Sequence, residues 1–139
     1  MRIVLDTNCL IQSIPKKSPF RIVWESFLSG ENVLCVSNAI IEEYMEILQR
    51  LTDNQTAALV IKTIVESPFV EFITPYYQFH LISADPDDNK FVDCAIAATA
   101  KYVVTNDHHY DILRQNDTFP TVEIISLKDF MELIQKNEL

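Results

Sequence analysis

The chain begins Met1-Arg-Ile-Val-Leu-Asp-Thr-Asn8, and this stretch decides the fold class. Its apolar run from residue 3 to residue 5 is typical of a short strand that is buried on both faces of a sheet. The run stops at Asp6, so the strand ends by presenting a carboxylate. In open α/β sheets, ligands bind just beyond the carboxyl ends of the strands. The position of Asp6 therefore raises the question of whether other carboxylates converge on the same edge.

Length and composition indicate one folded domain, residues 1–139. Hydrophobic residues make up 48% of the 139 residues and the mean hydropathy is +0.07, which argues against a disordered chain. The sequence has no run of about 18 apolar residues, so we expect no membrane span. The first residues also lack the pattern of a signal peptide. These features predict a cytoplasmic protein that does not associate with membranes.

Cysteine and glycine usage excludes several kinds of site. Cys9, Cys35 and Cys94 each stand among apolar neighbours, and their odd number and wide spacing argue against a disulfide framework or a zinc site. We expect reduced, buried thiols. Gly30 is the only glycine, whereas dinucleotide-binding fingerprints and P-loops each need several. Both of those nucleotide-binding sites are therefore excluded.

The net charge by itself speaks weakly against a nucleic-acid-binding protein. The chain has 20 acidic and 11 basic residues, for a formal charge of −9, whereas nucleic-acid-binding domains are usually basic. However, acidic residues clustered in a single metal-binding cleft would count toward this total and would be neutralised by the bound cation. The charge therefore does not decide the question.

Short apolar runs alternate with helical patterns along the whole chain. The predicted strands cover residues 3–5, 32–36, 70–73, 102–105 and 122–125. The predicted helices are a short turn through residue 11, a helix from Pro19 to a stop at Gly30, helices over 39–51, 55–66 and 91–100, one from 108 to about 115, and a last one after Ser126. This alternation predicts an α/β fold with a largely parallel sheet.

Polar residues mark the starts of several of these helices. Ser18 is expected to cap a helix with Pro19 in its first position, and Ser37, Asp53 and Ser126 are expected to cap later ones. The helix over 55–66 is predicted to bury an apolar face made of Ala58, Leu59, Ile61, Ile64 and Val65.

Two carboxylates fall where a helix is expected to be at least partly buried. Glu43 lies at the border of the apolar face of the helix over 39–51, between Ile40 and Ile47. Asp93 is the exception in a helix that is apolar nearly all round, and small residues follow it on the same face. Because burying a lone carboxylate is costly, each of them should have a partner or a task.

Carboxylates from distant parts of the chain should meet at one edge of the sheet. Asp6 and Asp107 each follow a strand, and Glu43, Asp88 and Asp93 lie in or next to the helices near that edge. Packed together without compensation, such acids would repel one another, and some would bind protons. A hard divalent cation with oxygen ligands, such as Mg²⁺, resolves this repulsion and suits phosphodiester hydrolysis.

Four motifs in order carry a family resemblance. They are VLDTN at residues 4–8, SxxxxxE at 37–43, DxxDNxFxDxAIAATA at 85–100 and VTND at 104–107. Together they cover nearly the whole chain and resemble the PIN domain family, in particular its bacterial VapC-like toxins of toxin–antitoxin pairs. The resemblance implies a three-layer α/β/α fold with a mainly parallel central sheet.

The resemblance also implies an activity and a set of site residues. PIN domains are Mg²⁺- or Mn²⁺-dependent nucleases that usually cut RNA. Their acids match Asp6, Glu43, Asp93 and Asp107 as catalytic residues here, while one subgroup emphasises the position of Asp88. The chain has both Asp88 and Asp93, so the expected metal ligands are Asp6 and Asp107 together with Asp88, Asp93 or both. A small antitoxin would mask the crevice, and many relatives form homodimers.

Other polar residues receive supporting roles in this hypothesis. Hydrogen bonds that hold the acids in place, or helix caps, are expected from Thr7, Asn8, Ser37, Thr105 and Asn106. Contacts with the substrate backbone are expected from Lys16, Lys17 and Arg21, with a solvated face as the equal alternative. His108 and His109 are expected to form an exposed pair at a helix start, because adjacent helical residues point apart.

Alternatives remain open at this stage. Asp6, Asp88 and Asp107 could serve as helix caps only, Glu43 could simply pair with an arginine, and Asp93 could be a structural residue of a buried helix. A haloacid-dehalogenase-type phosphatase is excluded, since Asn8 stands where its second aspartate is needed. A receiver domain is excluded too, because no aspartate closes the third predicted strand. A DNA or flap nuclease, an RNA-processing enzyme and a non-catalytic metal-binding module remain alternatives to a toxin ribonuclease.

Overall fold

A parallel five-stranded sheet forms the centre of the molecule. The computed structural model describes residues 1–82, 86–114 and 122–137. The strands are β1 (Arg2–Leu5), β2 (Val33–Val36), β3 (Val70–Phe72), β4 (Tyr102–Val104) and β5 (Ile124–Ile125). Their order across the sheet is β3-β2-β1-β4-β5, and every neighbouring pair is parallel. The predicted α/β class with a mainly parallel sheet is confirmed.

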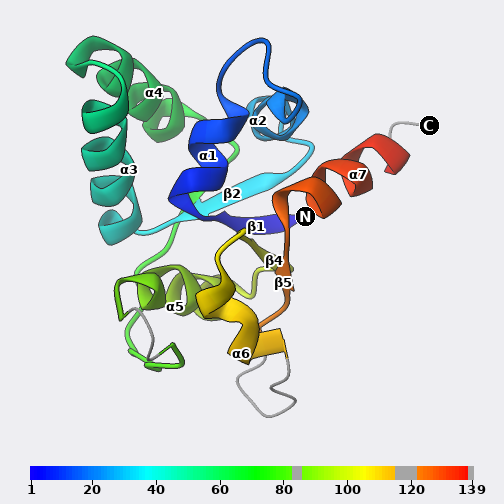
Figure 1. The fold of residues 1–139 in the computed structure, drawn as a ribbon. Coiled ribbons are helices and arrows are strands. Elements are labelled where there is room, and N and C mark those ends of the chain that lie inside the picture. Colours follow the sequence, from blue (N-terminus) through cyan, green and yellow to red (C-terminus); the bar gives the residue numbers. More distant parts are fainter. Residues whose placement is uncertain (83–85, 115–121, 138–139) are drawn as a thin grey trace.

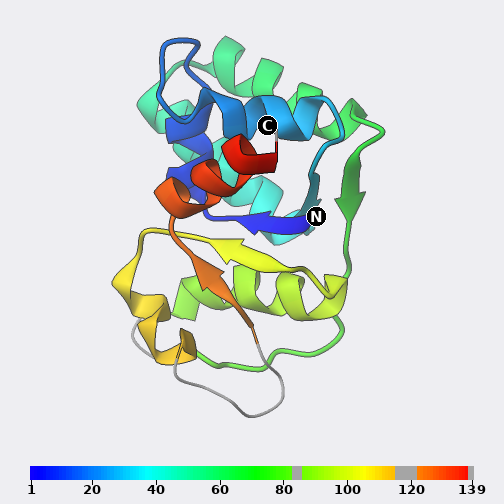
Figure 2. The ribbon, with the colours of Figure 1, turned by 90° about the vertical axis from the view of Figure 1, so that its right-hand side faces the viewer.

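Helices cover both faces of the sheet. One face carries α1 (Thr7–Ser13), α2 (Arg21–Leu28), α3 (Asn38–Leu51), α4 (Asn54–Glu66) and α7 (Leu127–Asn137). The other face carries α5 (Asn89–Ala98) and the short α6 (Asp111–Arg114) (Figures 1 and 2). Short 3₁₀ helices, η1 (Pro86–Asp88) and η2 (His108–Tyr110), precede α5 and α6. The arrangement confirms the predicted three-layer fold.

The direction in which strands are added reverses between β1 and β4. From β1 the chain adds β2 and then β3 on one side, and it then crosses back through α5 to place β4 on the other side of β1. Ligands of open α/β sheets bind at such a reversal, in the crevice beyond the carboxyl ends of the strands. Asp6 directly follows β1, and Thr105, Asn106 and Asp107 directly follow β4.

The core consists of the strands and the helix faces packed on them. Ile3, Val4, Leu5, Val103 and Val104 are fully buried, as expected for strands covered on both faces. The three cysteines are free and buried, as predicted. Burial raises the pKa of the Cys9 and Cys94 thiols to about 12, so both stay protonated at neutral pH. No helix in the described ranges is long and apolar enough to cross a membrane.

Two helix predictions from the sequence are wrong in detail. Helix α2 begins at Arg21, because Ser18 accepts the backbone N–H of Phe20 at 3.0 Å in a turn that precedes the helix. In α4 the buried residues are Ala57, Val60, Ile61 and Ile64, whereas Ala58, Leu59 and Val65, predicted for the apolar face, are exposed. The predicted caps Ser37, Asp53 and Ser126 are confirmed by bonds from Ile40, Thr56 and Asp129.

Helix α5 covers residues 89–98 instead of the predicted 91–100. It ends because Thr99 adopts a left-handed backbone conformation, with φ of 53°. Asp85, the first residue of the third motif, and residue 115, the predicted end of the helix after β4, lie outside the described residues.

Candidate active site

Asp6 occupies the carboxyl end of β1 and is held by its neighbours. Its backbone N–H donates to the carbonyl of Val104 at 3.0 Å, which ties the end of β1 to β4. Its carboxylate accepts the backbone N–H of Thr7 at 2.8 Å and the hydroxyl of Thr105 at 2.7 Å. Asp6 is buried, and these two donors fix the position of its carboxylate. Asp6 therefore caps α1 and also faces the end of β4.

Asp107 lies beside Asp6 at the end of β4. The buried Thr105 connects them, since its Oγ1 donates to Asp6 and accepts the backbone N–H of Asp107 at 3.0 Å. The Asp107 carboxylate also accepts the backbone N–H of His109 at 2.8 Å, which starts η2. The carboxylates that follow β1 and β4 therefore share one crevice, as the parallel strands predicted.

Asp88 joins this crevice from the start of α5. The side chain of His109 lies between Asp88 and Asp107, with its Nδ1 at 3.3 Å from one carboxylate and 3.2 Å from the other. One potential ligand atom from each of Asp88, Asp107 and His109 can be chosen so that all three lie within 4.8 Å of one another. Asp88 is buried, and its backbone carbonyl accepts the hydroxyl of Tyr110 at 3.3 Å.

Glu43 reaches the same crevice from α3. Its carboxylate accepts the hydroxyl of Thr7, the residue next to Asp6, and pairs with Lys90 Nζ at 2.7 Å. Both partners of this ion pair are about three-quarters buried, with side-chain exposures of 21% for Lys90 and 25% for Glu43. Two contacts therefore hold Glu43 in one orientation, and Lys90 places a positive charge at the edge of the acidic group.

The four acids share an electrostatic effect on one buried hydroxyl, that of Tyr110. Burial, and then the negative charges of Asp6, Asp88, Asp107 and Glu43, raise the pKa of Tyr110 far above its ordinary value. Burial also raises the pKa of Asp6, and the charges of Glu43 and Asp107 add to the rise, while the bonds from Thr105 and Thr7 oppose it. We call Asp6, Glu43, Asp88 and Asp107 the acidic cluster. A cation there would relieve this repulsion.

Among the described residues, the contacts of Asp93 lie outside the acidic cluster. Its carboxylate accepts the backbone N–H of Phe79 at 3.1 Å and lines a neighbouring hollow with Ser37 and Lys90. Burial raises the pKa of Asp93, and the Phe79 bond and the nearby His80 oppose that rise. Asp88 and Asp93 are five residues apart, which in a helix places two side chains about 140° from each other.

The five residues with predicted supporting roles divide into three groups. Thr7 and Thr105 donate directly to acids of the cluster, as described above. Ser37 caps α3, and Asn106 accepts the backbone N–H of Leu127 at 3.1 Å, so both hold helices in place. Asn8 lines an open hollow of about 280 Å³ that Asp6, Asn106 and Asp107 also line.

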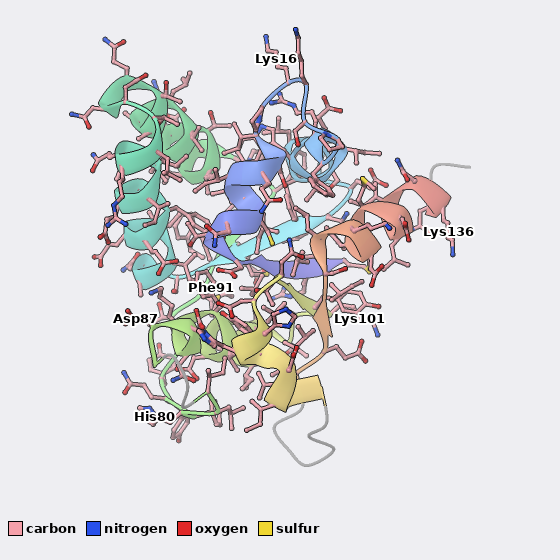
Figure 3. The ribbon with its side chains drawn as sticks, in the orientation of Figure 1. Lys16, His80, Asp87, Phe91, Lys101 and Lys136 are labelled. Carbon is pink, nitrogen blue, oxygen red and sulfur yellow. The ribbon has the colours of Figure 1, made fainter. Side chains whose placement is uncertain are left out.

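The predicted substrate-binding residues lie after α1, in the loop that follows it and at the first residue of α2. Lys16 and Lys17 are exposed in the loop between α1 and α2, and Figure 3 shows Lys16 at the opposite end of the molecule from Asp87 and α5. Arg21 is half-buried, donates to the carbonyl of Ile14 and lies 3.5 Å from Glu25. Its guanidinium group is therefore engaged within its own segment of the chain.

Sequence reasoning did not assign Lys90, His109 or Tyr110 to the site. His108 and His109 are both exposed, with side-chain exposures of 92% and 44%, so the predicted exposed pair is confirmed. The ring of His109 nevertheless lies beside the acids, with its Nδ1 close to Asp88 and to Asp107. The polar run that includes Asn89 and Lys90 was a usable signal, since a lysine two residues after Asp88 suggests a charge partner for an acid of the site.

Family comparison agrees with this geometry. The sequence model of the PIN domain matches residues 2–109, which include the whole acidic cluster. The chain belongs to the PIN domain family. The match spans β1 through β4, and the resemblance inferred from the four motifs is confirmed. No curated protein matches this PIN domain in sequence.

Solved structures with the same fold include two bacterial complexes. This PIN domain is similar to VapBC2 from Rickettsia felis bound to a DNA fragment from its promoter, with 16% identity and a TM-score of 0.62. It is similar to DNA-bound VapBC from Salmonella typhimurium, with 20% identity and a TM-score of 0.60. Each match covers 91% of this chain and 98% of the other.

A human protein has the same fold as well. The PIN domain of human SMG5 matches at 10% identity with a TM-score of 0.57, covering 96% of this chain and 98% of that one. At such identities these likenesses show the fold alone.

The acidic cluster has the oxygen ligands that a divalent ion needs. Ionised Asp6, Asp88 and Asp107 offer only acceptor oxygens, which Mg²⁺ and Mn²⁺ prefer. Asp88 and Asp107 already lie close enough to share an ion, together with the ring of His109. The residues present therefore fit a metal centre at the reversal point of the sheet.

Proposed function

We propose that this PIN domain is a metal-dependent endoribonuclease that hydrolyses RNA phosphodiester bonds and acts as the toxin of a toxin–antitoxin pair. One observation carries the proposal. Acids from three distant segments, Asp6, Asp88 and Asp107, gather where strand order reverses, with Glu43 oriented beside them. A group of like charges that is fully or partly buried is costly to keep without a function or a counter-ion.

In this proposal Asp6, Asp88 and Asp107 hold one or two Mg²⁺ or Mn²⁺ ions. The chemistry supplied by a bound ion is stabilisation of negative charge on the phosphate and activation of water. The earlier prediction that Asp93 is also a ligand stays a prediction, and this proposal does not depend on it. His109 is placed to assist, since its ring lies between two of the three proposed ligands.

The residues of the chain supply positioning and proton transfer. Thr7 and Thr105 hold the Asp6 carboxylate in place by hydrogen bonds. Glu43, fixed by Thr7 and Lys90, would orient the attacking water and accept its proton. Lys16 and Lys17 are exposed cations that would contact the RNA backbone beyond the crevice, and Arg21 is left with a smaller part because Ile14 and Glu25 engage it.

The central test is cleavage of a labelled single-stranded RNA with Mg²⁺, with Mn²⁺ and with EDTA. We expect cleavage that requires the metal and that falls by at least about 100-fold in Asp6→Asn, with the fold retained by circular dichroism. Asp129→Asn is the matched control, because this exposed aspartate of α7 lies outside the acidic cluster, and it should cleave like the wild type.

Wild-type rates in Asp6→Asn would refute the metal centre. An absence of cleavage by the wild type, together with binding of Mn²⁺, would favour the non-catalytic module. Matched DNA and RNA strands in the same assay separate a ribonuclease from a DNA or flap nuclease.

The toxin role is supported by the fold shared with two VapBC complexes. Expression in a bacterial host should arrest growth, and Asp6→Asn should not. Co-expression of a small protein encoded beside the gene should relieve the arrest by masking the crevice. Growth arrest that persists in Asp6→Asn would separate toxicity from the acidic cluster. A homodimer and a cytoplasmic location belong to the same proposal, and light scattering of the purified chain tests the first.

A further inference from the structure

A second hollow lies beside the acidic cluster, at the carboxyl ends of β2 and β3. It has a volume of about 230 Å³, and its walls include Ser37 and Asn38 at the start of α3 and Tyr77 and Gln78 after β3. Asp93 of α5 also lines it. An apolar cavity of about 150 Å³ admits benzene, so this hollow has room for a planar ring. We call it the base pocket.

The base pocket is joined to the acidic cluster by one side chain. Lys90 lines the base pocket and pairs with Glu43 at 2.7 Å, and Glu43 in turn binds Thr7 next to Asp6. All strands of the sheet are parallel, so the ends of β2 and β3 lie on the same edge as those of β1 and β4. A nucleic acid cut at the acidic cluster would therefore pass the base pocket.

Asp93 is a buried carboxylate with spare hydrogen-bonding capacity. It is 7% exposed, and within the described residues the Phe79 N–H at 3.1 Å is the one hydrogen bond that its carboxylate accepts. An ionised carboxylate has room for about four such bonds. A buried carboxylate with few partners is costly, and a ligand that donates to it would remove that cost.

Tyr77 offers an exposed aromatic surface at the base pocket. Its relative exposure is 75%, although tyrosine usually buries much of its ring. Exposed aromatic rings beside a nuclease site are suitable platforms on which single-stranded bases stack, because every base has a flat π face. Tyr77 supplies the stacking surface, and Asp93 supplies acceptors at the side.

We propose that the base pocket recognises a guanine of a single-stranded RNA that is bound for cleavage, an inference that rests on the proposed ribonuclease function. Guanine presents two adjacent donors, N1–H and the exocyclic amino group, on its Watson–Crick edge. The two oxygens of Asp93 match this pair, whereas adenine and cytosine each present one amino group next to an acceptor, and uracil one N–H between two acceptors. Gln78 also lines the base pocket and can donate an amide N–H to the guanine carbonyl.

Binding can be measured without cleavage by working in EDTA. The probes are two fluorescent oligouridylates of equal length, one with a central guanosine and the other with a central adenosine, followed by anisotropy. We expect the wild type to bind the guanosine strand about tenfold more tightly, as for other two-donor base contacts. Asp93→Asn, which replaces an acceptor by a donor at constant shape, should bind both strands equally.

Tyr77→Ala should weaken both strands by about tenfold and keep the guanosine preference. Tyr76→Ala is the matched control, because Tyr76 is 89% exposed but does not line the base pocket, and it should bind like the wild type. Equal binding of the two strands by the wild type would overturn the inference. An unchanged guanosine preference in Asp93→Asn would overturn it as well. A loss of Mn²⁺ binding in Asp93→Asn would also overturn it, because that loss would assign Asp93 to the metal.

A different result would reject the proposed ribonuclease function without rejecting the base pocket. Guanosine preference in EDTA, without cleavage of either strand in Mg²⁺ or Mn²⁺, would reject the ribonuclease and support the base pocket alone.

Discussion

At the scale of single residues, helix capping and membership of the acidic cluster occur together. Asp6 accepts the N–H of Thr7 at the start of α1, and Asp107 accepts the N–H of His109 at the start of η2. The simple interpretation of these aspartates as caps is therefore correct, and it also explains their geometry. A capped helix start holds the carboxylate in one direction, which is what a metal ligand requires.

Tyr44 connects α3 to the strand that carries Asp6. Its fully buried hydroxyl donates to the backbone carbonyl of Leu5, the last residue of β1. Tyr44→Phe removes this bond without changing the shape of the core. We expect the free energy of unfolding to fall by about 1 kcal/mol in urea titrations.

Tyr76→Phe is the control for that measurement, since Tyr76 is 89% exposed, and its effect should stay within about 0.5 kcal/mol. If Tyr44→Phe were as stable as Tyr76→Phe, the bond to Leu5 would contribute nothing to stability.

At the scale of helices, Gly30 follows α2 in a backbone conformation that favours glycine, and substitutions there test this preference. Its φ is +81°, and a Cβ there would lie 2.7 Å from the Phe69 ring. Gly30→Ala should destabilise the protein by about 1–2 kcal/mol from the backbone conformation, with the contact added. Asparagine tolerates this conformation better than alanine. In thermal unfolding of both variants, Gly30→Asn should therefore lose less stability than Gly30→Ala. Equal losses would assign the effect to Phe69 instead.

Asp53 gives a pH dependence to the start of α4. Its carboxylate accepts the backbone N–H and the hydroxyl of Thr56, and these bonds lower its pKa below the usual 3.8. Because the folded-state pKa is depressed, the stabilisation is complete above pH 3.8 and is lost as the pH falls through the lower folded value.

Asp53→Ala should therefore unfold at a lower temperature than the wild type at pH 7. The difference should shrink as the pH falls below 3.8. Asp129→Ala, at a helix start that Ser126 caps, is the comparison variant. A difference that stays constant down to the lowest pH at which both proteins are folded would contradict the assignment.

In α4, the hydrophobic periodicity of the sequence did not identify the buried face correctly. The predicted face of α4 included Leu59 and Val65, yet the helix packs through Ala57, Val60, Ile61 and Ile64. Apolar residues surround most of this helix, so the sequence allowed more than one face. Contact with α3 selected the buried one.

For the whole molecule, metal binding should be coupled to folding. The three proposed ligands come from the ends of β1 and β4 and the start of α5, so the unfolded chain has no such site. Mn²⁺ at 100 times its dissociation constant should stabilise the wild type by about 2.7 kcal/mol. Thermal unfolding with and without Mn²⁺ should show a gain in the wild type and in Asp129→Asn, and little or none in Asp107→Asn. An equal gain in all three would place the ion elsewhere.

The sequence by itself determined the order of strands and helices, the parallel sheet, and the meeting of Asp6 and Asp107. These follow from local patterns, because parallel strands deliver their carboxyl ends to one edge wherever they stand in the sheet. Helix caps such as Ser37 and Asp53 were predictable for the same reason, since a cap needs only its own first turn.

Only the tertiary structure decided which of two carboxylates, Asp88 at the end of η1 or Asp93 in α5, lies beside Asp107 and His109. Asp88 and Asp93 stand in one motif, and the rotation of α5 against the sheet, fixed by buried Phe91 and Val92, turns Asp88 toward Asp107 and Asp93 toward Tyr77. The pairing of Lys90 with Glu43 depends on the same packing. Such contacts join residues far apart in the chain, and no local pattern encodes the distance between them.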